Sequence, residues 1–160
     1  MSSAGDYYPE LKAELSRPEY EGLDHNAKAA KLNSPREANA ETYYRRLPPN
    51  ELLEWSAANA LLIVLKDKHA DTNVADAVRA ICFGALETIT SPHSKGLDLE
   101  NPVHMGMLDQ LVASDDVAEF NEEMRESLLA LARVTKTACE EVTDVGVKAT
   151  YLDVIRAERL

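Results

Sequence analysis

The sequence is poor in several residues that mark particular classes of protein. Its 160 residues include two cysteines, six glycines, two phenylalanines and one tryptophan. Two cysteines are too few for a disulfide scaffold, and six glycines exclude a collagen-like repeat. The longest uninterrupted apolar run, 60–65, is six residues long, whereas a membrane-spanning helix needs about twenty. The N-terminal residues lack the basic start and apolar stretch of a signal peptide, so we expect synthesis in the cytoplasm.

What the sequence has instead is a large share of helix formers. Alanine (22 residues) and leucine (20 residues) together make up about a quarter of the chain, and both have high helix propensity. The chain is long enough to bury a sizeable core, and no repeat, low-complexity tract or linker divides it. We therefore predict an all-α fold, one compact domain over 1–160 with about seven helical segments. It would consist of short N-terminal helices (1–47), a central helical core (50–142) and a C-terminal helix (150–160).

Capping residues and apolar periodicity predict where several helices begin. Asp24, Asn101 and Thr150 each precede an apolar-periodic stretch and have side chains suited to cap it, Thr150 as part of a capping box. Other predictions concern longer stretches: a helix over 34–46, a helix over 50–65, a helix capped by Asp71 or Thr72, and a long helix over 114–142. The loop between the central helices falls at 91–96, where Ser, Pro and Gly cluster.

No arrangement of residues in the sequence matches a familiar type of active or metal site. The four histidines have no glutamate three residues before or after them, so the ligand pair of di-iron helical bundles is missing. Zinc, calcium and phosphate-binding motifs are absent from the sequence, and so is the nucleophile elbow of hydrolases. We therefore expect no metal, no cofactor, no catalytic residue and a non-enzymatic function.

The two cysteines are predicted to be structural. Cys82 lies in an apolar stretch, where a cysteine behaves as a small buried hydrophobe. Cys139 precedes two glutamates, whose negative charges disfavour an activated thiolate.

Acidic residues outnumber basic ones by 28 to 17, and the formal net charge is −11. They concentrate between Asp109 and Glu126, where seven acidic residues are accompanied by one arginine. This surface is either the solvated side of an amphipathic helix or an electronegative surface that docks on a basic partner. The candidate contact residues in it are Glu119, Glu122, Glu123 and Glu126.

One compact cluster combines aromatic and basic side chains: Tyr43, Tyr44, Arg45 and Arg46. Tyrosine and arginine are effective anchors in protein–protein interfaces. Two arginines in a chain of net charge −11 are too few to hold the phosphates of nucleic acid. We therefore expect this cluster to contact protein or to end a helix. We expect no direct contact with nucleic acid, membrane or a small-molecule substrate.

Short motifs along most of the chain follow one family pattern. A Leu-Lys-Ala-Glu-Leu segment (11–15) precedes Tyr20 and an Ala-rich stretch that ends in Leu-Asn (27–33). Later segments read Leu-Leu-Ala-Leu-Ala (128–132) and Asp-Val-Ile-Arg-Ala (153–157). In these motifs the chain resembles small α-helical structural and assembly proteins that tailed bacteriophages encode among their head–tail or tail genes. The resemblance implies a structural or assembly role in the virion and no catalytic residues.

Two functional hypotheses follow. The leading one is a virion structural protein, a helical adaptor that contacts other virion proteins and copies of itself in a repeated assembly. Connector, collar, tail tube and tip remain open as its position. The alternative is a soluble acidic inhibitor or modulator that binds a basic host protein, with imitation of DNA as one way of doing so. A DNA mimic needs carboxylates over one broad face, whereas here they concentrate within 109–126, which favours the structural hypothesis.

Overall fold

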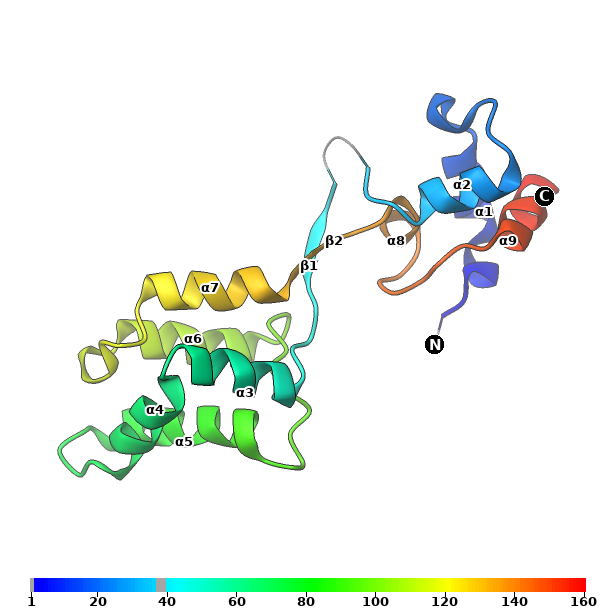
Figure 1. Ribbon diagram of the computed structural model, residues 1–160. Coiled ribbons are helices and arrows are strands. Elements are labelled where there is room, and N and C mark those ends of the chain that lie inside the picture. The colour runs from blue at the N-terminus through cyan, green and yellow to red at the C-terminus, as the bar shows by residue number, and fades with distance from the viewer. Residues whose placement is uncertain (1, 37–39) are drawn as a thin grey trace. The chain divides into compact units, whose positions relative to one another are not determined.

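The computed structural model describes residues 2–36 and 40–160. Within these residues the chain forms nine α-helices, three short 3-10 helices and two strands (Figure 1). The α-helices are α1 (Tyr8–Leu15), α2 (His25–Leu32), α3 (Pro49–Ala58), α4 (Leu61–Ala70), α5 (Asp76–Thr90), α6 (Pro102–Ala113), α7 (Glu122–Ala132), α8 (Ala138–Val142) and α9 (Tyr151–Glu158). The other elements are η1 (Ala4–Tyr7), η2 (Pro18–Tyr20), η3 (Asp115–Val117), β1 (Thr42–Tyr44) and β2 (Arg133–Thr135). The fold is mostly helical, as predicted, but it is not strictly all-α, because β1 and β2 pair in a small sheet.

The chain divides into two compact units. Unit 1 consists of Met1–Tyr43 and Val134–Leu160, and unit 2 consists of Tyr44–Arg133. Each unit has its own cluster of buried apolar residues, which corrects the prediction of one domain with a single central core. The helices near the two ends of the chain pack their apolar faces against each other. The helices in the middle of the chain pack together in a second core.

Unit 1 is built from both ends of the chain. Helix α9 packs against α1 and α2, and α8 packs against the same two helices; Figure 1 shows α1 and α9 side by side. The core of this unit contains Leu11, Tyr20, Leu32 and Val154, each at most 1% exposed. The C-terminal helix therefore completes a core that the N-terminal helices begin.

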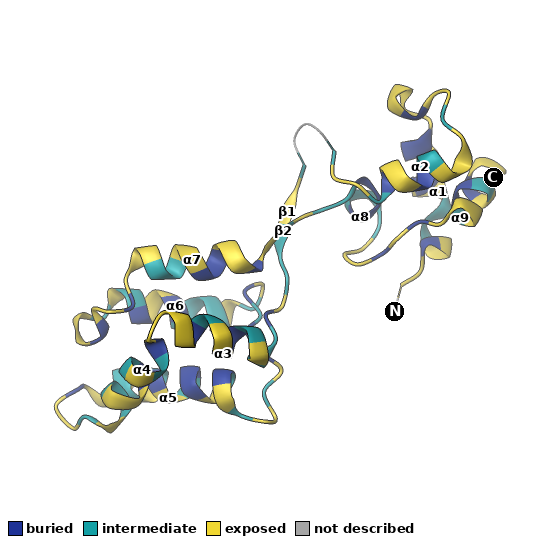
Figure 2. Ribbon diagram, viewed as in Figure 1, coloured by how far each residue is buried: buried dark blue, intermediate teal, exposed yellow. Residues whose placement is uncertain are grey.

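Unit 2 is a bundle of the helices α3 to α7. Helix α4 packs along α5, α3 contacts both, and α6 contacts α5 and α7. Figure 2 shows buried residues on each of these helices beside exposed ones, as expected of amphipathic helices. An isolated antiparallel bridge between Leu47 and Leu97 joins the segment before α3 to the loop after α5.

Three predicted helix starts are confirmed by their caps. The side chain of Asp24 accepts a hydrogen bond from a first-turn N–H of α2 at 2.8 Å, and Asn101 does the same for α6 at 2.9 Å. Thr150 and Asp153 form the predicted capping box at the start of α9. These bonds satisfy N–H groups that the first turn of a helix leaves without an intrahelical partner.

Two predicted helices in the first half of the chain differ from the structure. The helix predicted over 34–46 includes residues outside the described part, and Thr42–Tyr44 forms strand β1, because β-branched and aromatic residues suit a paired strand. The helix predicted over 50–65 divides into α3 and α4, because Ala60 adopts a left-handed conformation with φ 54°. Helix α5 begins at Asp76 rather than after Thr72, because residues 72–74 form a turn.

The long helix predicted over 114–142 consists of four separate elements. Ser114 caps the short η3, and the side chain of Asn121 accepts a hydrogen bond from an N–H of α7 at 3.0 Å. Helix α7 ends at Ala132, where the chain enters β2 before α8. Asparagine favours caps over helix interiors, and the β-branched pair Val134 and Thr135 favours an extended chain.

Candidate interaction surfaces

The predicted aromatic and basic cluster lies where the chain passes from unit 1 to unit 2. Tyr43 belongs to unit 1, whereas Tyr44, Arg45 and Arg46 belong to unit 2. The segment is extended rather than helical through Tyr44, so consecutive side chains point to opposite faces. The four residues therefore do not form one compact patch.

Tyr43 is half-buried beside a buried carboxylate. Burial raises the pKa of Tyr43, and the nearby charge and hydrogen bond of Glu140 raise this pKa further. Glu140 lies in α8 and is itself buried. Tyr43 is thus engaged within unit 1.

The two arginines of the cluster are ion-paired inside unit 2. Arg45 donates two hydrogen bonds to Glu51, at 3.2 and 2.5 Å, which lower the pKa of Glu51. Arg46 donates to Asp98 at 3.0 Å and lowers the pKa of that carboxyl. Half of the Arg46 side chain is still exposed (52%), so it is the better placed of the two arginines for contact with a partner.

The ring of Tyr44 makes a cation–π contact. The guanidinium of Arg133 lies 5.8 Å from the centre of the Tyr44 ring and donates a hydrogen bond to its hydroxyl at 3.4 Å. The backbone N–H of Tyr44 donates to the Glu100 carboxylate at 3.0 Å. Most of the predicted anchors therefore hold unit 2 together.

The acidic residues predicted as contacts are exposed but do not share one long helix. Glu119 precedes α7, and its carboxylate lies 3.9 Å from the ammonium of Lys68 on α4. Glu122 pairs with Arg125 on α7 at 2.9 Å, and Arg125 also pairs with Asp109 on α6 at 2.7 Å. These pairs neutralise part of the negative surface.

Two of the acidic contact candidates are left on the outer side of α7. Glu123 and Glu126 are both exposed. Glu123 lies in the first turn of α7, a position that also suits the positive end of the helix dipole. Glu123 and Glu126, together with the exposed Asp115 and Asp116, are the part of the predicted acidic surface that stays open to a basic partner.

A buried polar cluster in unit 1 was not predicted from the sequence. The Glu14 carboxylate, in a residue only 4% exposed, accepts hydrogen bonds from the Tyr20 hydroxyl at 3.1 Å and from Arg36 at 2.8 Å. Arg36 also pairs with Glu141 on α8 at 2.6 Å. Burial, with the charge of Glu14, raises the pKa of Tyr20. The spacing of these residues in the sequence does not predict the cluster, because only the folded chain brings them together.

Both units also expose large apolar side chains. In unit 1, α9 exposes Leu152, and Leu160 follows the helix with 64% of its surface exposed. In unit 2, Ile63 on α4 and Val103 on α6 are 66% and 75% exposed. Such residues become anchors when a partner covers them.

The histidines and cysteines are placed in ordinary surroundings. The Nε2 atom of His25 lies 3.2 Å from a carboxylate oxygen of Glu158. The Nδ1 atom of His104 accepts a hydrogen bond from the backbone N–H of Asp98 at 2.9 Å. Cys82 and Cys139 are free and buried, as predicted for Cys82, and burial raises the pKa of both thiols. Over 2–36 and 40–160, no three His, Cys, Asp or Glu side chains gather in a way that could hold a metal ion.

Comparison with known proteins adds no further constraint. Among the helices in the described part of the chain, none has the length and apolar character needed to cross a membrane. No family model matches the chain, and comparison with curated proteins and with solved structures found no match.

Proposed function

We propose that the chain is a non-enzymatic structural protein of a tailed-bacteriophage particle, an adaptor that contacts other virion proteins and further copies of itself. The observation that supports this proposal best is the division of only 160 residues into two units with separate cores. Unit 2 occupies an unbroken stretch of sequence inside unit 1. A chain of this kind offers two separate bodies for two separate contacts.

Two contact bodies on one chain suit a repeated assembly. When many copies stand in fixed positions, the first contact raises the effective concentration for the second, so individually weak interfaces hold firmly together. The exposed apolar residues Leu152 and Ile63, one on each unit, are suitable anchors. The open carboxylates Glu123 and Glu126 steer a basic neighbour and set the association rate more than the affinity.

The alternative function, an acidic inhibitor that imitates DNA, is less well supported. A mimic needs its carboxylates free over a broad face. Here Glu119 lies near Lys68, and Arg125 pairs with both Glu122 and Asp109. Within 109–126, four exposed carboxylates remain outside these pairs, those of Asp115, Asp116, Glu123 and Glu126, which is few for a broad row of phosphate-like groups.

Deletion of the gene from the phage tests the proposal. If the protein is an adaptor, infected cells accumulate unjoined or incomplete heads and tails, and the chain supplied from a plasmid restores whole particles. An inhibitor gives a different result, because particles assemble normally without it and only the yield or the host response changes. Normal particles in normal amount would contradict the proposal.

A further inference from the structure

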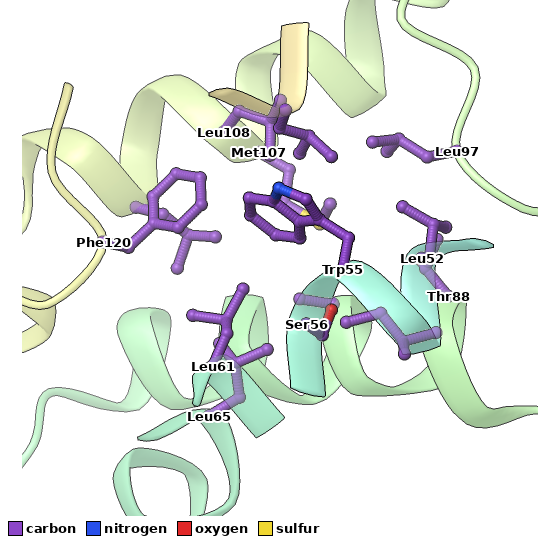
Figure 3. Close-up of a pocket in the computed structure, with 14 residues that line it drawn as sticks. Leu52, Trp55, Ser56, Leu61, Leu65, Thr88, Leu97, Met107, Leu108 and Phe120 are labelled. Carbon is purple, nitrogen blue, oxygen red and sulfur yellow. The ribbon is translucent and has the colours of Figure 1, made fainter. Parts of the chain in front are cut away.

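An apolar cavity lies in the core of unit 2, between the helices α3 to α7. Its volume is about 30 Å³, which is room for a molecule the size of water. Aliphatic side chains make up most of its wall, together with the aromatic rings of Trp55 and Phe120 (Figure 3). The cavity thus offers hydrocarbon contacts on almost every side.

Ser56 and Thr88 bring hydroxyls into this wall, and the hydroxyl of Ser56 is the unusual one. The Ser56 side chain is fully buried, and its hydroxyl has no hydrogen-bond partner within the described residues. Thr88 and Thr90 on α5 show the usual solution, since their hydroxyls donate to the carbonyl four residues earlier, at 2.9 and 2.8 Å. Ser56 leaves this bond unmade and lines the cavity instead (Figure 3). A buried hydroxyl without a partner destabilises a protein, and a bound polar atom would remove that penalty.

Trp55 is the part of the wall that is able to make room. Its indole lines the cavity but is only half-buried, and its Nε1 donates a hydrogen bond to Ser127 Oγ on α7 at 3.2 Å. This bond lies at the surface, where water replaces it readily when the side chain rotates. Rotation of the indole toward solvent would open the volume of an aromatic ring in the core.

We propose that this cavity binds a small uncharged molecule with an apolar body and one hydrogen-bonding group, of the size and chemistry of phenol. Trp55 gives way to the apolar body, and the Ser56 hydroxyl pairs with the polar group. A charged ligand is excluded because the wall has no charged side chain. Water alone is a poor occupant, because a buried water typically makes about three hydrogen bonds. Among the described residues the wall offers only two hydroxyls, and that of Thr88 already donates to the carbonyl of Gly84. This inference does not rest on the proposed function.

The fluorescence of Trp55 tests the proposal, since it is the only tryptophan of the chain. Phenol and toluene are matched probes, because a methyl group replaces the hydroxyl, and both are transparent at the red edge of tryptophan absorption. We expect phenol to change the emission of the native protein saturably and to bind about three- to tenfold more tightly than toluene. The methyl resonance of Met107, also in the wall, should shift with the same affinity.

Substitutions identify the polar partner. Ser56→Ala should abolish the preference for phenol while toluene still binds, and Thr72→Ala, at an exposed position between α4 and α5, should leave both affinities unchanged. The proposal is wrong if neither probe gives a saturable change, or if the two probes bind the native chain equally well. This comparison decides the matter even if Ser56→Ala does not fold. A preference for phenol that survives in folded Ser56→Ala would also contradict it.

Discussion

The backbone N–H of Arg45 donates a hydrogen bond to the carbonyl oxygen of Ala132 at 2.9 Å. These residues are close to the first and last positions of unit 2, Tyr44 and Arg133. The bond therefore holds the two ends of unit 2 next to each other, although they are far apart in the sequence. Adjacent ends are typical of a domain that is inserted into another or that folds alone.

The first prediction is that residues 44–133 fold without the rest of the chain. This stretch contains the whole buried cluster from Leu47 to Ala132, so it keeps every apolar contact of its core. We expect helical circular dichroism and one cooperative unfolding transition for the isolated fragment.

A shorter fragment provides the control. Residues 44–121 lack α7, and with it the buried side chains of Leu128, Leu129 and Ala132. This fragment should lose cooperative unfolding. A disordered 44–133 fragment would show that unit 2 depends on unit 1 and would contradict the prediction.

The second prediction is that core substitutions act on one unit at a time. Leu32 is fully buried in unit 1, and Leu111 is buried in unit 2. Replacement of either by alanine should lower the unfolding free energy of its own unit by about 2–5 kcal/mol. Trp55 reports on unit 2 alone, so denaturant unfolding followed by its fluorescence should shift for Leu111→Ala and stay unchanged for Leu32→Ala. Equal shifts for both variants would mean that the units unfold together.

The third prediction concerns the two glycines Gly96 and Gly84 of unit 2. Gly96 has φ +83°, and a Cβ added there would lie 2.0 Å from the carbonyl oxygen of Leu47. Gly96→Ala should therefore destabilise unit 2 by more than about 1 kcal/mol. Gly84 lies within α5 with open space around it, so Gly84→Ala should stabilise the helix by about 0.5–1 kcal/mol. Thermal unfolding followed by Trp55 fluorescence measures both, and a stabilised Gly96→Ala variant would contradict the structure of the 47–97 bridge.

The fourth prediction is a pH dependence that arises at Glu51. Hydrogen bonds from Arg45 lower the pKa of Glu51 below its ordinary value of 4.5. The pair therefore stabilises unit 2 fully above the pKa of the unfolded state, and this contribution is lost as the pH falls through the lowered folded-state pKa. Glu51→Gln should lose less stability than the native chain on acidification, and salt should narrow the difference because the pair is partly exposed. Parallel acid-unfolding curves for the two proteins would be inconsistent with this ion pair.

Local signals in the sequence were enough for several helices. The capping box of Thr150 and the Asn101-Pro102 start are short-range patterns, because the hydrogen bonds they predict join residues within one turn. Helical character follows from composition, and the burial of Cys82 follows from its apolar neighbours. In these places the local preference and the fold agree.

The sequence did not indicate where long helices break or where the chain divides. Ala60, between α3 and α4, adopts a left-handed conformation although alanine is the best helix former, so packing rather than propensity decides this break. The pairing of β1 with β2 and the Glu14–Arg36 contact join residues far apart in sequence. Such pairings depend on the whole fold, and the division into two units depends on them.

The most direct test of the adaptor account is quantitative mass spectrometry of purified particles of the phage that encodes this chain. The account predicts several copies per particle, in a fixed whole-number ratio to a ring-forming particle protein, and retained after the particles are washed. Absence from the particles, with abundance only in the infected-cell lysate, would contradict the account and favour the inhibitor.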